Sequence, residues 1–311
     1  MNATVVTVGT FDGVHRGHQA ILAEVARIAR EDGLDGVAYA FPFPPRFGDS
    51  GPHLILPREV KEQLLRKYVR RIVPGEFSRV RALSPREFAA RILVERLKVQ
   101  AVVIGEGFRF GRGREGDPTL LAALGREYGF AVITVPPVII AGAPVSSTRI
   151  RTLIRAGEVK EAGRLLGRPP LLTGRVVPGD RIGTKIGYPT ANISPQPELV
   201  RPQAGIYLAY AFWEEGEGPG LLYIGDRPTL AGGELRFELH LLSPPDRDLT
   251  GMTIEVRPLA RLRDDRKFPS ITALRRQISA DIATATSALS SYPKPASLLF
   301  PLDSGTPVNY P

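Results

Sequence analysis

The segment at residues 9–18 carries the first side chains whose types and spacing could do chemistry. It reads Gly-Thr-Phe-Asp-Gly-Val-His-Arg-Gly-His, follows an apolar run and precedes a helical pattern. Glycines let a backbone approach an anion, and the start of a helix supplies unpaired N–H groups with a partial positive charge. His15 and His18 could stabilise the charge that builds on a phosphoryl group during attack. We therefore expect a phosphate site here.

Two other interpretations of this histidine pair stay open. A metal site needs a third or fourth ligand at a suitable spacing, and the remaining histidines, His53 and His240, offer no such pattern. A turn with two solvated polar histidines would have no catalytic role.

A second candidate phosphate site lies at residues 145–151, which read VSSTRIR. Ser147, Thr148 and Arg149 fall at a predicted helix start, where hydroxyls and a guanidinium can hold phosphates. The alternative is an ordinary helix cap followed by surface arginines.

A loop in the second half of the chain ends in residues that could bind a metal ion. Gly179, Gly183 and Gly187 precede the run Pro-Thr-Ala-Asn at 189–192. Such a loop can wrap phosphates with its N–H groups. The oxygen atoms of Thr190 and Asn192 suit magnesium, a hard cation often shared between protein and nucleotide phosphates.

Glu238 is a charged residue within the alternating run LRFELHL at 235–241. Alternation along a strand puts it on one face with Arg236 and His240, opposite Phe237 and Leu239. From the pattern alone, the favoured interpretation is a solvent-facing glutamate that pairs with a neighbouring cation.

These candidate residues need a scaffold, and the first half of the chain alternates short β-branched runs with helical patterns. We expect strands at 5–8, 36–41, 101–104 and 131–135, and helices at 19–30, 58–70 and 85–97. This alternation predicts a parallel α/β sheet. Ser84, Pro85 and Glu87 predict a capping box at the start of the third helix. Residues 130–145 are expected to form a buried strand plus a loop, because prolines interrupt a run shorter than the ~20 residues that span a bilayer.

The second half, after a helical segment at 147–166, changes to short strands separated by glycines. Runs at 171–177, 205–212, 221–224, 235–242 and 252–258 predict a small antiparallel barrel, closed by a helix at 271–284. We therefore predict an α/β domain at 1–167, a barrel domain at 168–289 and an irregular or disordered tail at 290–311.

Composition limits the class of protein. The chain has 311 residues, of which 43% are hydrophobic and 23% charged, as in globular proteins. It contains no cysteine, which excludes disulfides, thiolate zinc sites and cysteine nucleophiles. No basic region precedes the first apolar run, so we expect no secretory signal and predict a cytoplasmic protein. The net charge of +9 would attract anions, but solvated helix faces are favoured over a nucleic-acid patch because no interleaved aromatics accompany the charge.

The string GTFDGVHRGHQ at 9–19 resembles the HxGH nucleotidyltransferases. It is most similar to the adenylyltransferase half of prokaryotic bifunctional riboflavin kinase/FMN adenylyltransferases, the FAD synthetases. Other motifs are similar to the same family, in chain order, over residues 4–285. They lie at 105–111 with 116–117, at 145–151, at 189–192, at 224–229, at 237–242 and at 259–268.

The resemblance implies a Rossmann-like nucleotidyltransferase domain followed by a riboflavin kinase β-barrel with a C-terminal helix. It implies phosphorylation of riboflavin to FMN and adenylylation of FMN to FAD with release of pyrophosphate, with ATP as co-substrate and Mg²⁺ as cofactor. His15, His18 and Glu238 would be catalytic, with Glu238 as the general base, and Thr190 and Asn192 would bind the metal ion. The nucleotide-binding residues would be Gly9, Phe11, Asp12, Gly13, Gly17, Ser146, Ser147, Thr148, Arg149, Gly179, Gly183 and Gly187. The flavin-binding residues would be Phe108, Arg109, Phe110 and Asp117.

Two departures from the family pattern lie on the expected flavin side. Gly107 replaces a usual aspartate, and the proline-rich loop at 41–46 lacks a histidine. The alternative is therefore a riboflavin kinase whose adenylyltransferase half is impaired or retargeted. A further alternative, from another class, is a basic flavin- or nucleic-acid-binding regulator without turnover.

Overall fold

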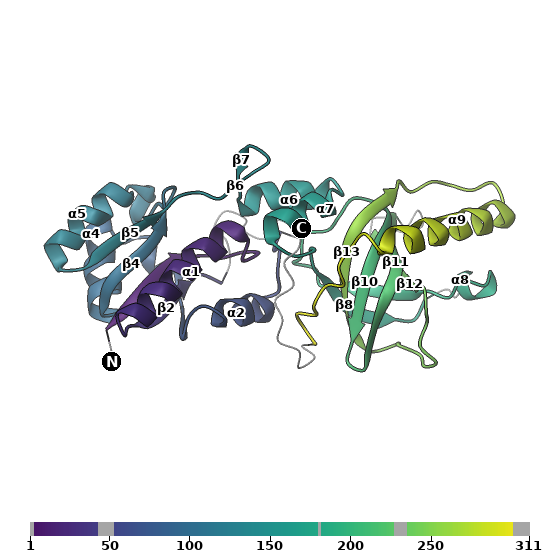
Figure 1. Cartoon of the computed structure of the whole chain (residues 1–311), viewed down its shortest axis with the longest axis horizontal. Coiled ribbons are helices and arrows are strands. Elements are labelled where there is room, and N and C mark those ends of the chain that lie inside the picture. The colour runs from purple at the N-terminus through teal and green to yellow at the C-terminus, as the bar shows by residue number, and fades with distance from the viewer. Residues whose placement is uncertain (1–2, 43–52, 180–181, 227–234, 301–311) are drawn as a thin grey trace. The chain divides into compact units, whose positions relative to one another are not determined.

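The computed structural model describes residues 3–42, 53–179, 182–226 and 235–300 (Figure 1). The chain forms two compact units. The first unit comprises Met1–Ser50 with Leu56–Ser147, and the second comprises Gly51–Ile55 with Thr148–Pro311. The units divide the chain between Ser147 and Thr148, whereas the sequence analysis places its boundary after residue 167.

The first unit is built on a parallel five-stranded sheet, as predicted. The strand order is β3-β2-β1-β4-β5. The strands are β1 (Thr4–Gly9), β2 (Asp35–Ala40), β3 (Arg71–Pro74), β4 (Val99–Gly105) and β5 (Ala131–Val135). The central residues Val6, Val37 and Val102 are fully buried, as in strands that are covered on both faces. The order reverses between β1 and β4, and in sheets of this type ligands bind outside the carboxyl ends of the strands at that point.

Helices cover both faces of this sheet. α1 (Arg16–Glu31) lies on one face, where its Val25 approaches the backbone of Gly36. The opposite face packs against η1 (Phe88–Arg96), a π-helix that continues α4 (Pro85–Glu87), and against α5 (Pro118–Tyr128). Ser84 and Glu87 form the predicted capping box at the start of α4. The other elements of this unit are α2 (Arg58–Arg66), α3 (Phe77–Val80), η2 (Arg112–Arg114), β6 (Ile139–Ile140) and β7 (Ala143–Pro144).

The two edge strands differ from the sequence expectation. The helix expected at 58–70 ends at Arg66, and the chain then forms β3, which the sequence analysis does not predict. β5 is expected to be buried, but it lies at the other edge of the sheet with Ala131 and Thr134 exposed. An edge strand pairs on one side only, so its burial depends on the tertiary arrangement and not on its own sequence.

The second unit is a closed barrel of antiparallel strand pairs, as predicted (Figure 1). The strand order around the barrel is β10-β11-β12-β9-β8-β13. The strands are β8 (Leu172–Val177), β9 (Ala191–Pro195), β10 (Gly205–Trp213), β11 (Gly216–Asp226), β12 (Leu235–Leu241) and β13 (Thr253–Arg263). β9 pairs with β8 and β12 and is not predicted by the sequence analysis. It is the strand that completes the closure, and closure removes the exposed edges of a sheet.

The remaining helices are α6 (Ser147–Arg155), α7 (Val159–Leu166), α8 (Ile182–Lys185) and α9 (Ile271–Leu289). The helical segment expected at 147–166 is interrupted at Gly157, whose φ of +78° is a left-handed conformation that glycine adopts without strain. In the part of the chain that the structure describes, no helix is long and apolar enough to cross a membrane.

A buried ion pair of the second unit holds the start of the tail. Glu255 and Arg257 on β13 are 0% and 1% exposed, and their charged groups are 3.0 Å apart. Glu255 also accepts hydrogen bonds from the hydroxyl of Ser297 at 2.8 Å and from the N–H groups of Leu298 and Leu299 at 2.9 and 2.8 Å. Buried charges are tolerated where such partners replace the lost hydration.

Candidate functional site

The loop between β1 and α1, which we call the histidine loop, brings the two predicted histidines to a helix start. α1 begins at Arg16 rather than at Gln19, so His15 is its N-cap residue. The Nδ1 atom of His15 accepts a hydrogen bond from the N–H of His18 at 3.3 Å. His15 thus takes the role that serine or aspartate commonly has at a helix start. Both histidines stand where the helix dipole favours an anion.

The imidazole rings of His15 and His18 stack on each other. Their centroids are 3.6 Å apart, and the ring planes differ by 16°. His15 is 5% exposed, His18 is half-buried, and Phe11 meets the ring of His18 edge-on. Gly17 leaves room for the pair, because a Cβ at that position would lie 3.2 Å from Cε1 of His15. This packing differs from the solvated turn that the sequence analysis leaves open.

Polar side chains hold carbonyl groups of the same loop. The hydroxyl of Ser147 donates to the carbonyl of Asp12 at 2.8 Å. The side-chain amide of Gln19 donates to the carbonyl of Val14 at 2.8 Å. The first of these bonds joins the two motifs that the sequence analysis assigns to the nucleotide, although they are far apart in the chain.

The second predicted nucleotide motif runs into α6. Ser146 and Arg149 are half-buried and Thr148 is exposed. Ser147 is the first residue of the helix, which agrees with the predicted helix start. The binding of phosphates by Thr148 and Arg149 stays a prediction.

Lys61 is a buried cation of the first unit that the sequence analysis does not single out. It lies on α2, is 5% exposed, and donates hydrogen bonds to the carbonyls of Thr10, Phe41 and Pro42. Burial lowers the pKa of its ammonium group, while the nearby charge of Asp12 acts in the opposite direction. The signal that could have found it is its place among the apolar positions Val60, Leu64 and Leu65 of α2, which face the core.

The predicted flavin-binding residues lie after β4, at the same end of the parallel sheet as the histidine loop. Phe108 is half-buried and Arg109 is exposed. Phe110 stacks on Phe108 with ring centroids 5.6 Å apart and belongs to the core. Asp117 caps α5 by accepting a hydrogen bond from the N–H of Leu120 at 2.8 Å. The structure therefore gives Phe110 and Asp117 architectural contacts, while Phe108 stays half-buried and Arg109 exposed.

A cavity of about 280 Å³ between the barrel wall and α9 gathers the predicted kinase residues. Gly183, Thr190, Asn192 and Glu238 line it. Asn192 on β9 and Glu238 on β12 are cross-strand partners, which is why residues far apart in the sequence meet here. Lining side chains that the sequence analysis does not assign include Tyr188, Tyr223, Arg263, Asp265, Arg266 and Asp281.

Glu238 faces this cavity, as strand alternation predicts. Phe237 and Leu239 are 2% and 1% exposed in the core, whereas the side chain of Glu238 is 18% exposed. One carboxylate oxygen accepts a hydrogen bond from Arg236 at 2.9 Å, and the other accepts one from the hydroxyl of Thr190 at 3.2 Å. Glu238 does pair with a cation, as the surface interpretation expects, but it does so inside a cavity and in contact with a predicted metal ligand.

The glycine-spaced loop packs closely against its neighbours. A Cβ at Gly179 would lie 2.0 Å from Nδ2 of Asn192, and a Cβ at Gly183 would lie 2.3 Å from the carbonyl oxygen of Tyr188. Gly187 has φ +85°, which favours glycine. Residues 180–181 of this loop lie outside the described residues, as do 227–229 of the motif at 224–229 and 43–46 of the proline-rich loop.

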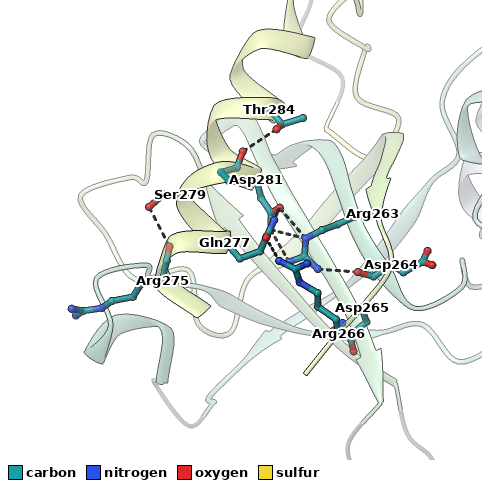
Figure 2. A network of polar contacts seen from close by, with 10 residues as sticks. Arg263, Asp264, Asp265, Arg266, Arg275, Gln277, Ser279, Asp281 and Thr284 are labelled. Atoms are coloured by element: carbon teal, nitrogen blue, oxygen red, sulfur yellow. Dashed lines mark hydrogen bonds and ion pairs between the residues drawn. The ribbon is translucent and has the colours of Figure 1, made fainter. Parts of the chain in front are cut away.

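A network between the end of β13 and α9 supports another part of the cavity lining (Figure 2). Arg263 donates hydrogen bonds to the carboxylate of Asp281 at 2.9, 3.1 and 2.7 Å, and Gln277 donates another at 2.7 Å. Tyr223 donates to Asp265 at 3.1 Å. Burial, and then the charge of Asp265, raise the pKa of Tyr223 to about 12. These contacts fix α9 and the segment after β13 beside the cavity.

Comparisons with known proteins match two separate parts of the chain to two family models. Residues 1–149 match the family model described as FAD synthetase, and residues 166–289 match the model described as riboflavin kinase. A curated protein from Pseudomonas fluorescens named bifunctional riboflavin kinase/FMN adenylyltransferase is 38% identical over 286 residues, which are 90% of this chain and 91% of that protein. Proteins of the same name from Escherichia coli (strain K12) and Haemophilus influenzae are 37% and 32% identical, over 90% and 92% of this chain and 91% and 94% of theirs.

A solved structure is similar over most of both chains. Its title is macrolide-efflux protein from Streptococcus pneumoniae. The TM-score is 0.84 at 32% identity, and the match covers 92% of this chain and 94% of that chain. The combination of a parallel sheet and a closed barrel is therefore shared with a solved relative.

Proposed function

Because the chain belongs to the family of bifunctional riboflavin kinase/FMN adenylyltransferases, we propose which of its residues carry each of the two reactions. The enzyme phosphorylates riboflavin to FMN and adenylylates FMN to FAD, with ATP as co-substrate in both steps. The observation that carries the assignment is the contact between Glu238 and Thr190 in the barrel cavity. The cytoplasmic location expected from the sequence stays a prediction.

In the kinase step, Glu238 is the general base. The 5′-hydroxyl oxygen of riboflavin attacks the γ-phosphorus of ATP, the bond from this phosphorus to the β,γ-bridging oxygen breaks, and ADP leaves. The carboxylate of Glu238 accepts the hydroxyl proton. Arg236, 2.9 Å from one carboxylate oxygen, holds the orientation of the group. The cavity that Glu238 lines is a suitable place for this proton transfer because its surroundings are partly desolvated.

Thr190 and Asn192 would hold a magnesium ion that is shared with the phosphates of ATP. The donor set fits this ion, because a hydroxyl and an amide carbonyl are hard oxygen ligands and magnesium usually keeps further positions for phosphate and water. The site borders the glycine-spaced loop, since Asn192 packs against the backbone of Gly179. When bound, the ion would neutralise charge on the transferring phosphoryl group.

In adenylyl transfer, His15 and His18 stabilise the charge on the α-phosphate of ATP. The phosphate of FMN attacks this phosphorus atom and pyrophosphate leaves, so no covalent enzyme intermediate is required. The position of the stacked histidines at the N-terminus of α1, at the point where the strand order reverses, supports this role. Thr148 and Arg149 hold the leaving phosphates, and Ser147, whose hydroxyl donates to Asp12, shapes the loop.

Phe108 and Arg109 are the proposed contacts to the flavin of FMN, because Phe110 is buried in the core and Asp117 caps α5, whereas Phe108 is half-buried and Arg109 is exposed. Gly107 departs from the family pattern on this side. A Cβ at this residue would meet no atom within 4 Å, so the loop leaves open space for a side chain at this position. The match of residues 1–149 to the FAD synthetase model favours an active adenylyltransferase over an impaired one.

The test is chromatographic separation of flavins after incubation of the protein with riboflavin, ATP and Mg²⁺. We expect both FMN and FAD, and a chelator should stop their formation. Supplying FMN directly separates the two activities, because FAD and pyrophosphate should then form without the kinase step. FMN without FAD would support the impaired adenylyltransferase, and the absence of both products at high enzyme concentration would refute the proposed function.

A further inference from the structure

Lys61 is the buried lysine of the first unit whose contacts the two reactions do not explain. Its Nζ atom donates to the carbonyl oxygens of Thr10 at 3.3 Å, Phe41 at 3.0 Å and Pro42 at 3.1 Å. A lysine ammonium has three N–H donors and a neutral amine has two, so only the charged form can serve all three carbonyls. A charged group that is 5% exposed is costly unless it is hydrogen-bonded in this way.

The three carbonyls lie after two neighbouring strands. Thr10 follows β1, and Phe41 and Pro42 follow β2, which pairs with β1 in parallel. The N–H of Phe41 also donates to the carbonyl of Gly9 at 3.0 Å. Lys61 therefore ties the carboxyl end of β1, from which the histidine loop starts, to the carboxyl end of β2.

The histidine loop needs such support because its backbone is strained. Phe11 and Val14 have φ values of +50° and +38°, a region that bulky and β-branched residues rarely adopt. Such a backbone conformation persists only where the surroundings fix it. Lys61 holds the carbonyl of the peptide unit between Thr10 and Phe11, directly before the first of these residues.

Holding a carbonyl also orients an amide. A peptide unit is planar and trans, so its N–H points away from its C=O. Lys61 thereby fixes the orientation of the Thr10–Phe11 peptide unit. The hydrogen bond from Ser147 fixes the orientation of the peptide unit after Asp12 in the same way. Both bonds set the backbone at the position where the proposed function puts the phosphates of ATP.

We propose that Lys61 is a positioning residue for adenylyl transfer, whose ammonium holds the histidine loop in the conformation that receives the phosphates of ATP. This inference rests on the proposed function of that loop. A purely structural role would change the amount of folded enzyme but would leave the KM for ATP unchanged. A positioning role must change the KM for ATP of the folded enzyme.

The first experiment compares Lys61→Met with Lys67→Met in FAD formation from FMN and ATP. Lys67 is the exposed C-cap residue of the same helix and gives a matched control. We expect Lys61→Met to raise the KM for ATP and to lower kcat/KM for ATP about 10²-fold, the size of effect that a displaced binding geometry can produce. The KM for FMN and riboflavin phosphorylation in the barrel should stay within about twofold, and Lys67→Met should match the wild type in every constant.

The second experiment restores the ammonium chemically. The chain has no cysteine, so Lys61→Cys introduces a unique thiol. The variant is alkylated in denaturant with bromoethylamine, which rebuilds an ammonium, or with iodoacetamide, which adds a neutral group of similar length. Both samples are then refolded beside the wild type.

We expect the aminoethyl adduct to regain most of the kcat/KM for ATP, and the neutral adduct to resemble Lys61→Met. An unchanged KM for ATP in Lys61→Met, whatever the yield of folded protein, overturns the proposal, as do equal activities of the two adducts. Failure of the wild type to form FAD would instead count against the proposed function, so the two failures are distinguishable.

Discussion

Replacement of Glu238 by glutamine tests the kinase assignment with little change in structure. One carboxylate oxygen of Glu238 accepts from Arg236 and the other from Thr190. In Glu238→Gln, the amide oxygen can still accept from Arg236. The amide NH₂ can donate to the hydroxyl of Thr190, which is able to accept as well as to donate. The substitution therefore keeps both contacts and removes the group that accepts the proton.

The expected effect on the reaction is larger than the expected effect on stability. Loss of a general base lowers a rate by about 10² to 10⁴, which corresponds to about 2.7 to 5.4 kcal/mol of activation free energy. The side chains of Arg236 and Glu238 are 26% and 18% exposed, so both remain partly hydrated. Loss of such an ion pair costs about 1 kcal/mol of unfolding free energy. A loss of FMN formation by two or more orders of magnitude would therefore report chemistry and not unfolding.

The assay measures FMN formation from riboflavin at saturating ATP and Mg²⁺, and separately FAD formation from supplied FMN. FMN formation should fall by about 10² to 10⁴, while FAD formation continues at the wild-type rate. Glu214→Gln is the matched control, because Glu214 is exposed in the turn between β10 and β11. Near-normal FMN formation by Glu238→Gln would return Glu238 to the surface interpretation, and equal loss of both activities would indicate misfolding.

Three further predictions concern separate parts of the molecule. His18→Ala should lower FAD formation by about 10²-fold or more, as for removal of a transition-state donor, while riboflavin phosphorylation persists; equal loss of both would contradict separate sites. Glu255→Gln leaves the buried Arg257 without its carboxylate and should lower the unfolding free energy by about 3 to 5 kcal/mol. Urea unfolding followed by the fluorescence of Trp213, the chain's single tryptophan, measures this loss, and an unchanged midpoint would refute it. Burial raises the pKa of Tyr207 and of Tyr223 to about 12 from 10.0, so these phenols ionise first in the unfolded chain, and stability should fall as pH rises from about 10 to about 12. Unfolding free energies over this pH range should fall less steeply in the double phenylalanine variant, and an equal slope would refute the assignment.

The sheet and most of the barrel could be predicted because their strands are apolar runs bounded by turn residues. β3 and β9 could not. β3 has four residues, Arg71–Pro74, and directly follows an arginine-rich helical pattern. β9, Ala191–Pro195, begins inside the predicted metal motif and has little apolar character. Both are strands because neighbouring strands pair with them, and such pairing energy is not visible in a local sequence.

The cavity could be predicted only in part, for a related reason. Thr190, Asn192 and Glu238 belong to recognisable motifs, and the pairing of β9 with β12 brings them together. Arg263 and Asp281 meet through the packing of α9 on the end of β13, as Figure 2 shows. No periodicity in either segment specifies that contact, because it depends on where the helix docks.

Phosphate sites and flavin sites differ in how much of their chemistry a sequence displays. A phosphate site needs backbone N–H groups at a helix start, glycines at a close approach and a few cationic or hydroxyl side chains, and each of these has a distinct residue type. The histidine loop has these features, and its residues alone predict a phosphate site there. A flavin ring is bound largely through apolar and aromatic contacts, and the same residue types build the core. Phe110 illustrates the consequence: it belongs to a flavin-side motif, yet it packs in the core against Phe88. Sequence patterns therefore predict a phosphate site more sharply than a site for the isoalloxazine ring, and accessibility in the structure is what separates Phe108 from Phe110.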